Sequence, residues 1–103
     1  MISYAICVCT EDRELNTLLN FLTTVKSKED EIVVLVDRTQ LNRDVENVLN
    51  AYRGIRIYGR EFKNDFAEHK NFLNRKCRGE YIFNIDADEV PTEELIKDRK
   101  SVV

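Results

Sequence analysis

Two aspartates, Asp86 and Asp88, follow an apolar run and are the residues best suited to carry chemistry. Residues two apart on a strand point to the same side, so the two carboxylates are expected to converge. Converging carboxylates repel each other unless a cation or hydrogen bonds neutralise them. Mg²⁺ and Mn²⁺ take oxygen ligands and commonly share them with substrate phosphates. The pair therefore indicates a divalent-metal site, and the alternative is an acidic turn that leads into a final helix.

A lysine on the apolar side of a predicted helix is the second candidate. Successive residues turn by about 100° around an α-helix, which places Lys70 within the stripe formed by Phe66, Leu73 and Cys77. This helix runs antiparallel to the strands, so Lys70 can reach the same end of the sheet and meet a phosphate as a point charge. The alternative is that its stem packs while its ammonium extends to water. His69, the only histidine, is expected to be exposed or structural.

Three other positions carry polar or reactive groups. Asp37 closes a second apolar run, where an acid can accept hydrogen bonds from a base or a ribose or open a loop as an Asx turn. Cys7 and Cys9 have no second pair of zinc ligands nearby and are expected to be small core residues. The sequence contains neither G-x-G-x-x-G nor the Walker lysine motif, which weighs against dinucleotide oxidoreductases and P-loop enzymes.

Length and composition restrict the class of protein. With 103 residues, 43% of them apolar and 34% charged, residues 1–103 are expected to form a single globular domain. The 16 basic and 19 acidic residues give a net charge of −3, whereas a nucleic-acid binder is usually basic. No apolar run approaches the roughly 18 residues of a membrane helix, and the N-terminus lacks the basic leader of a signal peptide. Three cysteines form no disulfide framework, so a cytoplasmic protein is expected.

Alternating apolar runs and helical patterns must position these residues. Strands are predicted over Ile2–Thr10, Glu31–Asp37, Ile55–Tyr58 and Tyr81–Ile85. Helices are predicted over Asp12–Lys26, from Leu41 to near Gly54, over Asp65–Cys77 and from Pro91 onward, with Asp12 and Asp65 as N-caps. Such alternation is typical of a mostly parallel sheet with helices on both faces, which binds ligands at the carboxyl ends of its strands. Polar loops gather there, which indicates one shared site: Thr10–Arg13, Asp37–Gln40, Gly59–Asn64 and Asp86–Glu89.

Two segments carry a resemblance to a known family. Residues 64–71 read NDFAEHKN, and residues 78–89 read RGEYIFNIDADE. Together they resemble the GT-A glycosyltransferases of the family-2 type, in which a D-F-(S/A)-x-x-(R/K)-N helix precedes G-(E/D)-(Y/W)-I-x-x-(L/I)-D-A-D-(E/D). The resemblance extends over nearly the whole chain. It implies the nucleotide-binding half of the GT-A fold, an α/β, Rossmann-like, mostly parallel sheet of strand order 3-2-1-4 with flanking helices.

The resemblance also implies a ligand and the residues that bind it. The ligand is a nucleotide-diphospho-sugar, by family habit a UDP-sugar, with Mn²⁺ or Mg²⁺ as the cofactor. Asp86 and Asp88 are the implied metal ligands, and the metal offsets charge on the departing nucleoside diphosphate as a Lewis acid. The implied nucleotide-binding residues are Thr10, Asp12, Asp37, Lys70, Asp86, Ala87 and Asp88.

The chain departs from the family pattern in two respects. Arg38 stands where the family usually has an acidic residue. The family's second half builds the acceptor site and supplies a general base in inverting enzymes, and we expect it to be missing after Asp88. Glu89 is the nearest acid that could act as a base, with a loop or helix-start role as the alternative. We therefore expect a metal-dependent glycosyltransferase with an unknown acceptor. The alternatives are a nucleotide-sugar-binding module without transferase activity alone, and an interaction domain derived from that fold.

The fourth predicted strand has a consequence for assembly. In the order 3-2-1-4 it lies at the edge of the sheet, and it is rich in apolar side chains from Tyr81 to Ile85. Exposed apolar edges invite pairing with another chain. A homodimer, or a partner chain that covers this edge, is therefore expected.

Overall fold

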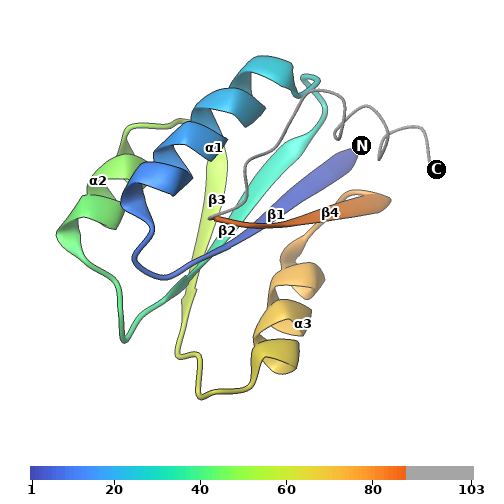
Figure 1. The fold of residues 1–103 in the computed structure, drawn as a ribbon. Coiled ribbons are helices and arrows are strands. Elements are labelled where there is room, and N and C mark those ends of the chain that lie inside the picture. Colours follow the sequence, from blue (N-terminus) through green and yellow to red (C-terminus); the bar gives the residue numbers. More distant parts are fainter. Residues whose placement is uncertain (88–103) are drawn as a thin grey trace.

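Strands and helices alternate along the chain in a computed structural model, which describes residues 1–87. The strands are β1 (Ile2–Val8), β2 (Glu31–Asp37), β3 (Ile55–Arg60) and β4 (Tyr81–Asp86). The helices are α1 (Asp12–Val25), α2 (Arg43–Asn50) and α3 (Phe66–Lys76). Every strand pair is parallel, and the sheet order is β3-β2-β1-β4 (Figure 1). The predicted α/β fold and its strand order are confirmed.

Helices cover both faces of the sheet. Figure 1 shows α1 and α2 on one side and α3 on the other. Alternate residues of β1 follow this division, because Tyr4 and Ile6 join the core under α1 and α2 whereas Ala5 packs with Leu73 of α3. Residues of β1 and β2 are therefore apolar on both faces, as expected for a parallel sheet covered on both sides.

The leucines of α1 contribute most of its packing energy. Helical spacing puts them on one stripe, and all four are completely buried: Leu15, Leu18, Leu19 and Leu22. Burying each such side chain stabilises the fold by about 1.5–3 kcal/mol. The opposite side of α1 is polar and exposed, so the helix is fixed in rotation and its N-terminus lies at the carboxyl end of β1.

The ends of the elements differ from the predicted ones for identifiable reasons. Asp12 is the first residue of α1 and not its N-cap, because the preceding Glu11 ties the turn: its Oε2 accepts the N–H of Cys9 at 2.8 Å and of Thr10 at 3.1 Å. Those bonds also end β1 at Val8, two residues before the predicted end. The prediction for Asp65 is confirmed, since its Oδ1 accepts the N–H of Glu68 at 3.0 Å.

Three other boundaries shift by a few residues. β3 continues to Arg60 because Arg60 still pairs with Asp37 of β2. β4 includes Asp86, which pairs with Cys7 of β1. α2 ends at Asn50, before the predicted stop near Gly54, and Gly54 instead takes a left-handed conformation (φ 78°) in the turn into β3. No helix among residues 1–87 has the length and apolar character needed to cross a bilayer.

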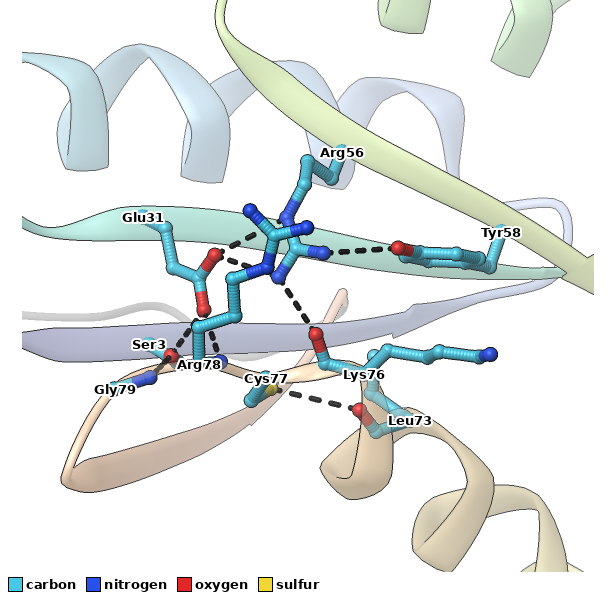
Figure 2. A network of polar contacts seen from close by, with 9 residues as sticks. All are labelled: Ser3, Glu31, Arg56, Tyr58, Leu73, Lys76, Cys77, Arg78 and Gly79. Carbon is cyan, nitrogen blue, oxygen red and sulfur yellow. Dashed lines mark hydrogen bonds and ion pairs between the residues drawn. The ribbon is translucent and has the colours of Figure 1, made fainter.

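A polar network fastens the amino ends of the strands (Figure 2). Glu31, the first residue of β2, accepts from Arg56 Nη2 at 2.6 Å, from the backbone N–H of Arg78 at 2.6 Å and from the Ser3 hydroxyl. Burial raises the pKa of the Glu31 carboxyl, but these hydrogen bonds and the Arg56 charge outweigh it, so the pKa lies below its usual value. The Gly79 N–H donates to Ser3 Oγ at 2.8 Å, which joins the entry of β4 to β1. This end of the sheet is therefore structural, and the opposite end is left for a ligand.

Candidate functional site

A pocket of about 230 Å³ opens at the carboxyl ends of β1 and β4. In parallel α/β sheets this end is where ligands bind. Three groups of described residues line it. They are Cys7, Val8, Cys9 and Glu11 from β1 and its loop, Asp86 and Ala87 from β4, and Phe62, Phe66 and His69 from the β3–α3 loop and α3.

Asp86 gives the pocket an acidic wall. It ends β4 beside Cys7 of β1, and the next N–H, of Ala87, donates to Cys7 O at 3.1 Å. The sheet pairing therefore holds the Asp86 backbone in a fixed place. Burial, and next the charge of Asp86, raise the pKa of the Cys7 thiol to about 11. Asp88 and Glu89, predicted as a metal ligand and a candidate base, lie outside the described residues.

Aromatic rings form another wall of the pocket, called the aromatic wall below. The Phe62 ring meets Phe66 at 6.1 Å between centroids and His69 at 5.3 Å, both edge to face. The turn that presents them contains Lys63 and Asn64, both left-handed (φ 54° and 58°). Few side chains favour that conformation, so the local backbone is set by the packing of this loop. Polar and aromatic side chains thus line one small pocket together.

Lys70 lies beside this pocket. Its Nζ stands 5.4 Å from the centroid of the Phe66 ring, and its charge acts to lower the pKa of the Cys7 thiol. Both of those residues line the pocket, so a cation stands near its rim. The predicted stripe of α3 is wrong at Phe66, which is 49% exposed; the buried side chains of α3 are His69 and Leu73.

Asp37 lies behind the aromatic wall and is only 3% exposed. Its Oδ1 accepts the N–H of Thr39 at 3.0 Å and the Thr39 hydroxyl at 2.7 Å, which is the Asx turn that the sequence left open. Burial raises its pKa, but the bonds from Thr39 and from the backbone N–H of Phe62 outweigh that effect, so the pKa lies below its usual value. The carboxylate therefore fixes the loop that carries Phe62. Contact between Asp37 and a base stays a prediction.

Thr10 and Asp12 flank a residue that the sequence reasoning missed. Thr10 is exposed and Asp12 is half-buried at the start of α1, whereas Glu11 between them lines the pocket. The family resemblance implies Thr10 and Asp12 as nucleotide-binding residues but does not include Glu11. Its role follows from its two bonds to backbone N–H groups, which only the folded turn brings together.

His69 is the second residue that was missed. The sequence predicted it to be exposed or structural; it is buried (4% exposed), so it is not exposed, and it also lines the pocket. Burial, and next the charge of Arg60, lower its pKa, while Asp37 acts in the opposite direction. Its position one residue before Lys70 was the available signal, since both belong to the first half of the same helix.

The described residues supply too few ligands to hold a hard cation by themselves. Within residues 1–87 no group of three or more His, Cys, Asp or Glu side chains is placed to hold a metal ion. Two carboxylates, of Asp86 and Glu11, line the pocket. Carboxylate oxygens are the ligands that Mg²⁺ and Mn²⁺ prefer. The donor type therefore fits the predicted cation, and completing the set would require Asp88.

Comparisons with known proteins agree with this architecture. TarP of Staphylococcus aureus (strain N315), a poly(ribitol-phosphate) beta-N-acetylglucosaminyltransferase, is 26% identical over 88 residues, which cover 84% of this chain and 26% of TarP. Two crystal structures of S. aureus TarS, one in complex with UDP, match at TM-scores of 0.74 and 0.72 with 18% identity. These matches cover 97% of this chain and 31% of TarS, and at that identity they show a shared fold.

The chain thus spans about a third or less of the length of these relatives. The sequence model of the family described as glycosyl transferase family 2 matches residues 3–99. That match includes the described sheet except its first residue, Ile2, together with the pocket and α3. The resemblance seen in the sequence is confirmed, and the chain belongs to glycosyl transferase family 2.

Proposed function

We propose that the pocket binds a nucleotide-diphospho-sugar, a UDP-sugar, as the donor of a glycosyl transfer reaction. The observation that carries this proposal is the placement of Asp86 and Lys70 around one pocket at the carboxyl edge of the sheet. Membership of a glycosyl transferase family supports it, and so does a structural neighbour crystallised with UDP. Thr10, Asp12, Asp37 and Ala87 are the further nucleotide-binding residues of this proposal.

The size and lining of the pocket fit one part of such a donor. Its volume of about 230 Å³ is below the roughly 300–1,000 Å³ of pockets that enclose whole drug-sized ligands. The aromatic wall of Phe62 and Phe66 offers ring faces and edges to a flat base. Lys70 at the rim supplies a positive charge for the diphosphate. The remainder of the donor would then extend out of the pocket.

A divalent cation, Mn²⁺ or Mg²⁺, completes the proposal. Asp86 and Asp88 would hold it, because they are carboxylates two residues apart at the end of β4. When bound, the cation offsets the negative charge that develops on the departing nucleoside diphosphate. Without it, Asp86 and Glu11 would repel the diphosphate from the pocket that they line.

Thermal unfolding tests the binding half of the proposal. The chain is melted with UDP, GDP or CDP, each with and without Mn²⁺. Ligand at 100 times its dissociation constant stabilises a protein by about 2.7 kcal/mol, which is roughly 10–20 °C for a domain of this size. We expect a Mn²⁺-dependent shift that is largest with UDP. No shift with any nucleotide would overturn the proposal.

Matched variants locate the cation. Asp86→Asn and Asp88→Asn should each abolish the part of the UDP shift that depends on Mn²⁺. Glu80→Gln is the control, because this exposed acid lies at the opposite end of the sheet and pairs only with the N-terminal amine among the described residues. If Asp88→Asn leaves the Mn²⁺ dependence unchanged, the metal assignment is wrong even though UDP binds.

Product analysis tests transfer itself. The chain is incubated with a UDP-sugar and Mn²⁺, and free sugar or glycoside is measured against unchanged donor. Formation of either product supports a transferase, and Glu89→Gln should then slow turnover without weakening UDP binding if Glu89 is the base. Unchanged donor together with Mn²⁺-dependent UDP binding would favour the alternative, a nucleotide-sugar-binding module without transferase activity alone.

A further inference from the structure

An unusual polar atom lies at the aromatic wall of the pocket. The Nδ1 atom of His69 is buried and has no hydrogen-bond partner within residues 1–87. Buried polar side-chain atoms nearly always have a partner in the protein, in ordered water or in a ligand. Other atoms of His69 line the pocket while Nδ1 is shielded from solvent, so a ligand there can become the missing partner once the imidazole turns toward it.

The neighbours of His69 are already committed to other bonds. Arg60 donates through Nη1 to Glu68 O at 3.0 Å and pairs through Nη2 with Glu68 Oε1 at 3.0 Å. Asp37 holds Thr39 with its Oδ1. Phe62 presents only a ring, edge to face at 5.3 Å. None of these side chains supplies a partner for Nδ1 within residues 1–87.

The charge state of His69 restricts what it can bind. Burial and the Arg60 charge lower its pKa against the opposing effect of Asp37, which favours the neutral imidazole. The other charged groups at the pocket are Asp86, Glu11 and Lys70. A neutral imidazole offers one donor and one acceptor, which suits a carbonyl, an imide or a hydroxyl. A diphosphate is better matched by Lys70 and a cation.

We propose that His69 is a nucleoside-binding residue, whose Nδ1 forms a hydrogen bond with the base or the ribose of the bound nucleotide. This rests on the proposed function, and it specifies how the ligand is oriented in the pocket. The nucleoside lies against His69, Phe62 and Phe66, and the diphosphate lies toward Lys70 and Asp86. His69 and both phenylalanine rings line the same pocket and contact one another, so one planar group can lie against all three.

Three substitutions separate the hydrogen bond from the shape of the ring. His69→Phe keeps a ring but has no nitrogen. His69→Asn places a polar atom near the position of Nδ1, whereas His69→Gln places it near Nε2. Asn74→Leu is the matched control, because Asn74 Oδ1 in the same helix also lacks a partner among the described residues but lies outside the pocket lining.

Affinity for UDP and for uridine is measured by isothermal titration with Mn²⁺ present, alongside the melting temperature of each variant without ligand. His69→Phe should weaken UDP about tenfold, the worth of one hydrogen bond, and should weaken uridine by the same factor. The affinity of His69→Asn for both ligands should stay within about threefold of the wild-type affinity. The affinity of Asn74→Leu should equal the wild-type affinity. The ligand-free melting temperature of His69→Phe should not fall, because the change removes an unpartnered buried nitrogen.

Each failure has a separate meaning. Wild-type affinity in His69→Phe, or a loss for UDP that is absent for uridine, would overturn the assignment while the proposed function stands. If His69→Phe does not fold, equal affinities of His69→Asn and His69→Gln would overturn it. A wild-type chain that binds none of UDP, GDP and CDP would overturn the proposed function, and this inference with it.

Discussion

Gly79 is the position at which one added methyl group should cost the fold most. An ideal Cβ there would lie 2.7 Å from Ser3 Oγ and 2.8 Å from both Met1 O and Ser3 N. Two of these three neighbours are backbone atoms at the start of β1, so they cannot move aside as the end of a flexible side chain can. Gly79→Ala must therefore push the entry of β4 away from β1.

The magnitude follows from two effects. Overpacking of this kind costs about 1–3 kcal/mol. Displacing the Gly79 N–H from Ser3 Oγ, now at 2.8 Å, loses a hydrogen bond worth about 0.5–1.5 kcal/mol. Together they amount to about 2–4 kcal/mol. One kcal/mol shifts the melting temperature of such a domain by about 4–8 °C, so we expect a fall of roughly 10–30 °C.

Thermal melting and urea unfolding measure this loss, with Gly54→Ala as the comparison. Gly54 has a left-handed backbone but open space around it, so alanine there costs only about 1–2 kcal/mol from conformation. At a temperature where Gly79→Ala is still folded, nucleotide affinity should be unchanged, because Gly79 lies at the end of the sheet opposite the pocket. Melting of Gly79→Ala at the wild-type temperature would refute the argument that close backbone approach requires glycine.

Three further predictions concern pH, the diphosphate and assembly. The folded-state pKa of Glu31 is depressed, so its carboxylate stabilises the fold above the unfolded pKa of about 4.3. This stabilisation is lost as the pH falls through the folded pKa. Urea unfolding at decreasing pH should show that loss, and the loss should be smaller in Glu31→Gln. Lys70→Met should weaken UDP about 10–100-fold, the worth of a charged hydrogen bond, but leave uridine affinity unchanged in calorimetry; equal losses for both ligands would place Lys70 at the nucleoside. The β4 edge exposes Tyr81 and Ile82 (44% and 38%), so light scattering should detect a homodimer unless a partner chain covers this edge. Ile82→Lys should dissociate the homodimer. A concentration-independent monomer mass would count against the homodimer.

The sheet was predictable because burial on both faces leaves a plain sequence signal. Residues 31–37 form one uninterrupted apolar run closed by acids, and β2 has the predicted bounds. In contrast, the ends of β1 and β4 depend on bonds that no local pattern reveals. Cys9 and Thr10 bond to Glu11 instead of a neighbouring strand, whereas β4 stays paired to β1 as far as Asp86.

The rotation of α3 was not predictable from spacing alone. Leu73 belongs both to a stripe with Phe66 and Lys70 and to a stripe with His69. Each stripe contains an apolar and a polar residue, so the helical period does not choose between them. The choice comes from the loop before the helix, where Phe62 packs on both Phe66 and His69 and directs His69 inward.

The same distinction explains which site residues a sequence can reveal. Strand ends such as Asp37 and Asp86 are found by pattern, because an acid directly after an apolar run is conspicuous. The structure shows what such acids bond to. The carboxylates of Asp37 and of Glu11 accept backbone N–H groups and keep their loops in place, which preorganises the pocket. His69 has the opposite property, since its Nδ1 is buried and unpartnered in the part of the chain that the structure describes. A missing hydrogen-bond partner is a property of the folded surroundings, so neither a motif nor the helical period could single out His69 as the nucleoside-binding residue proposed above.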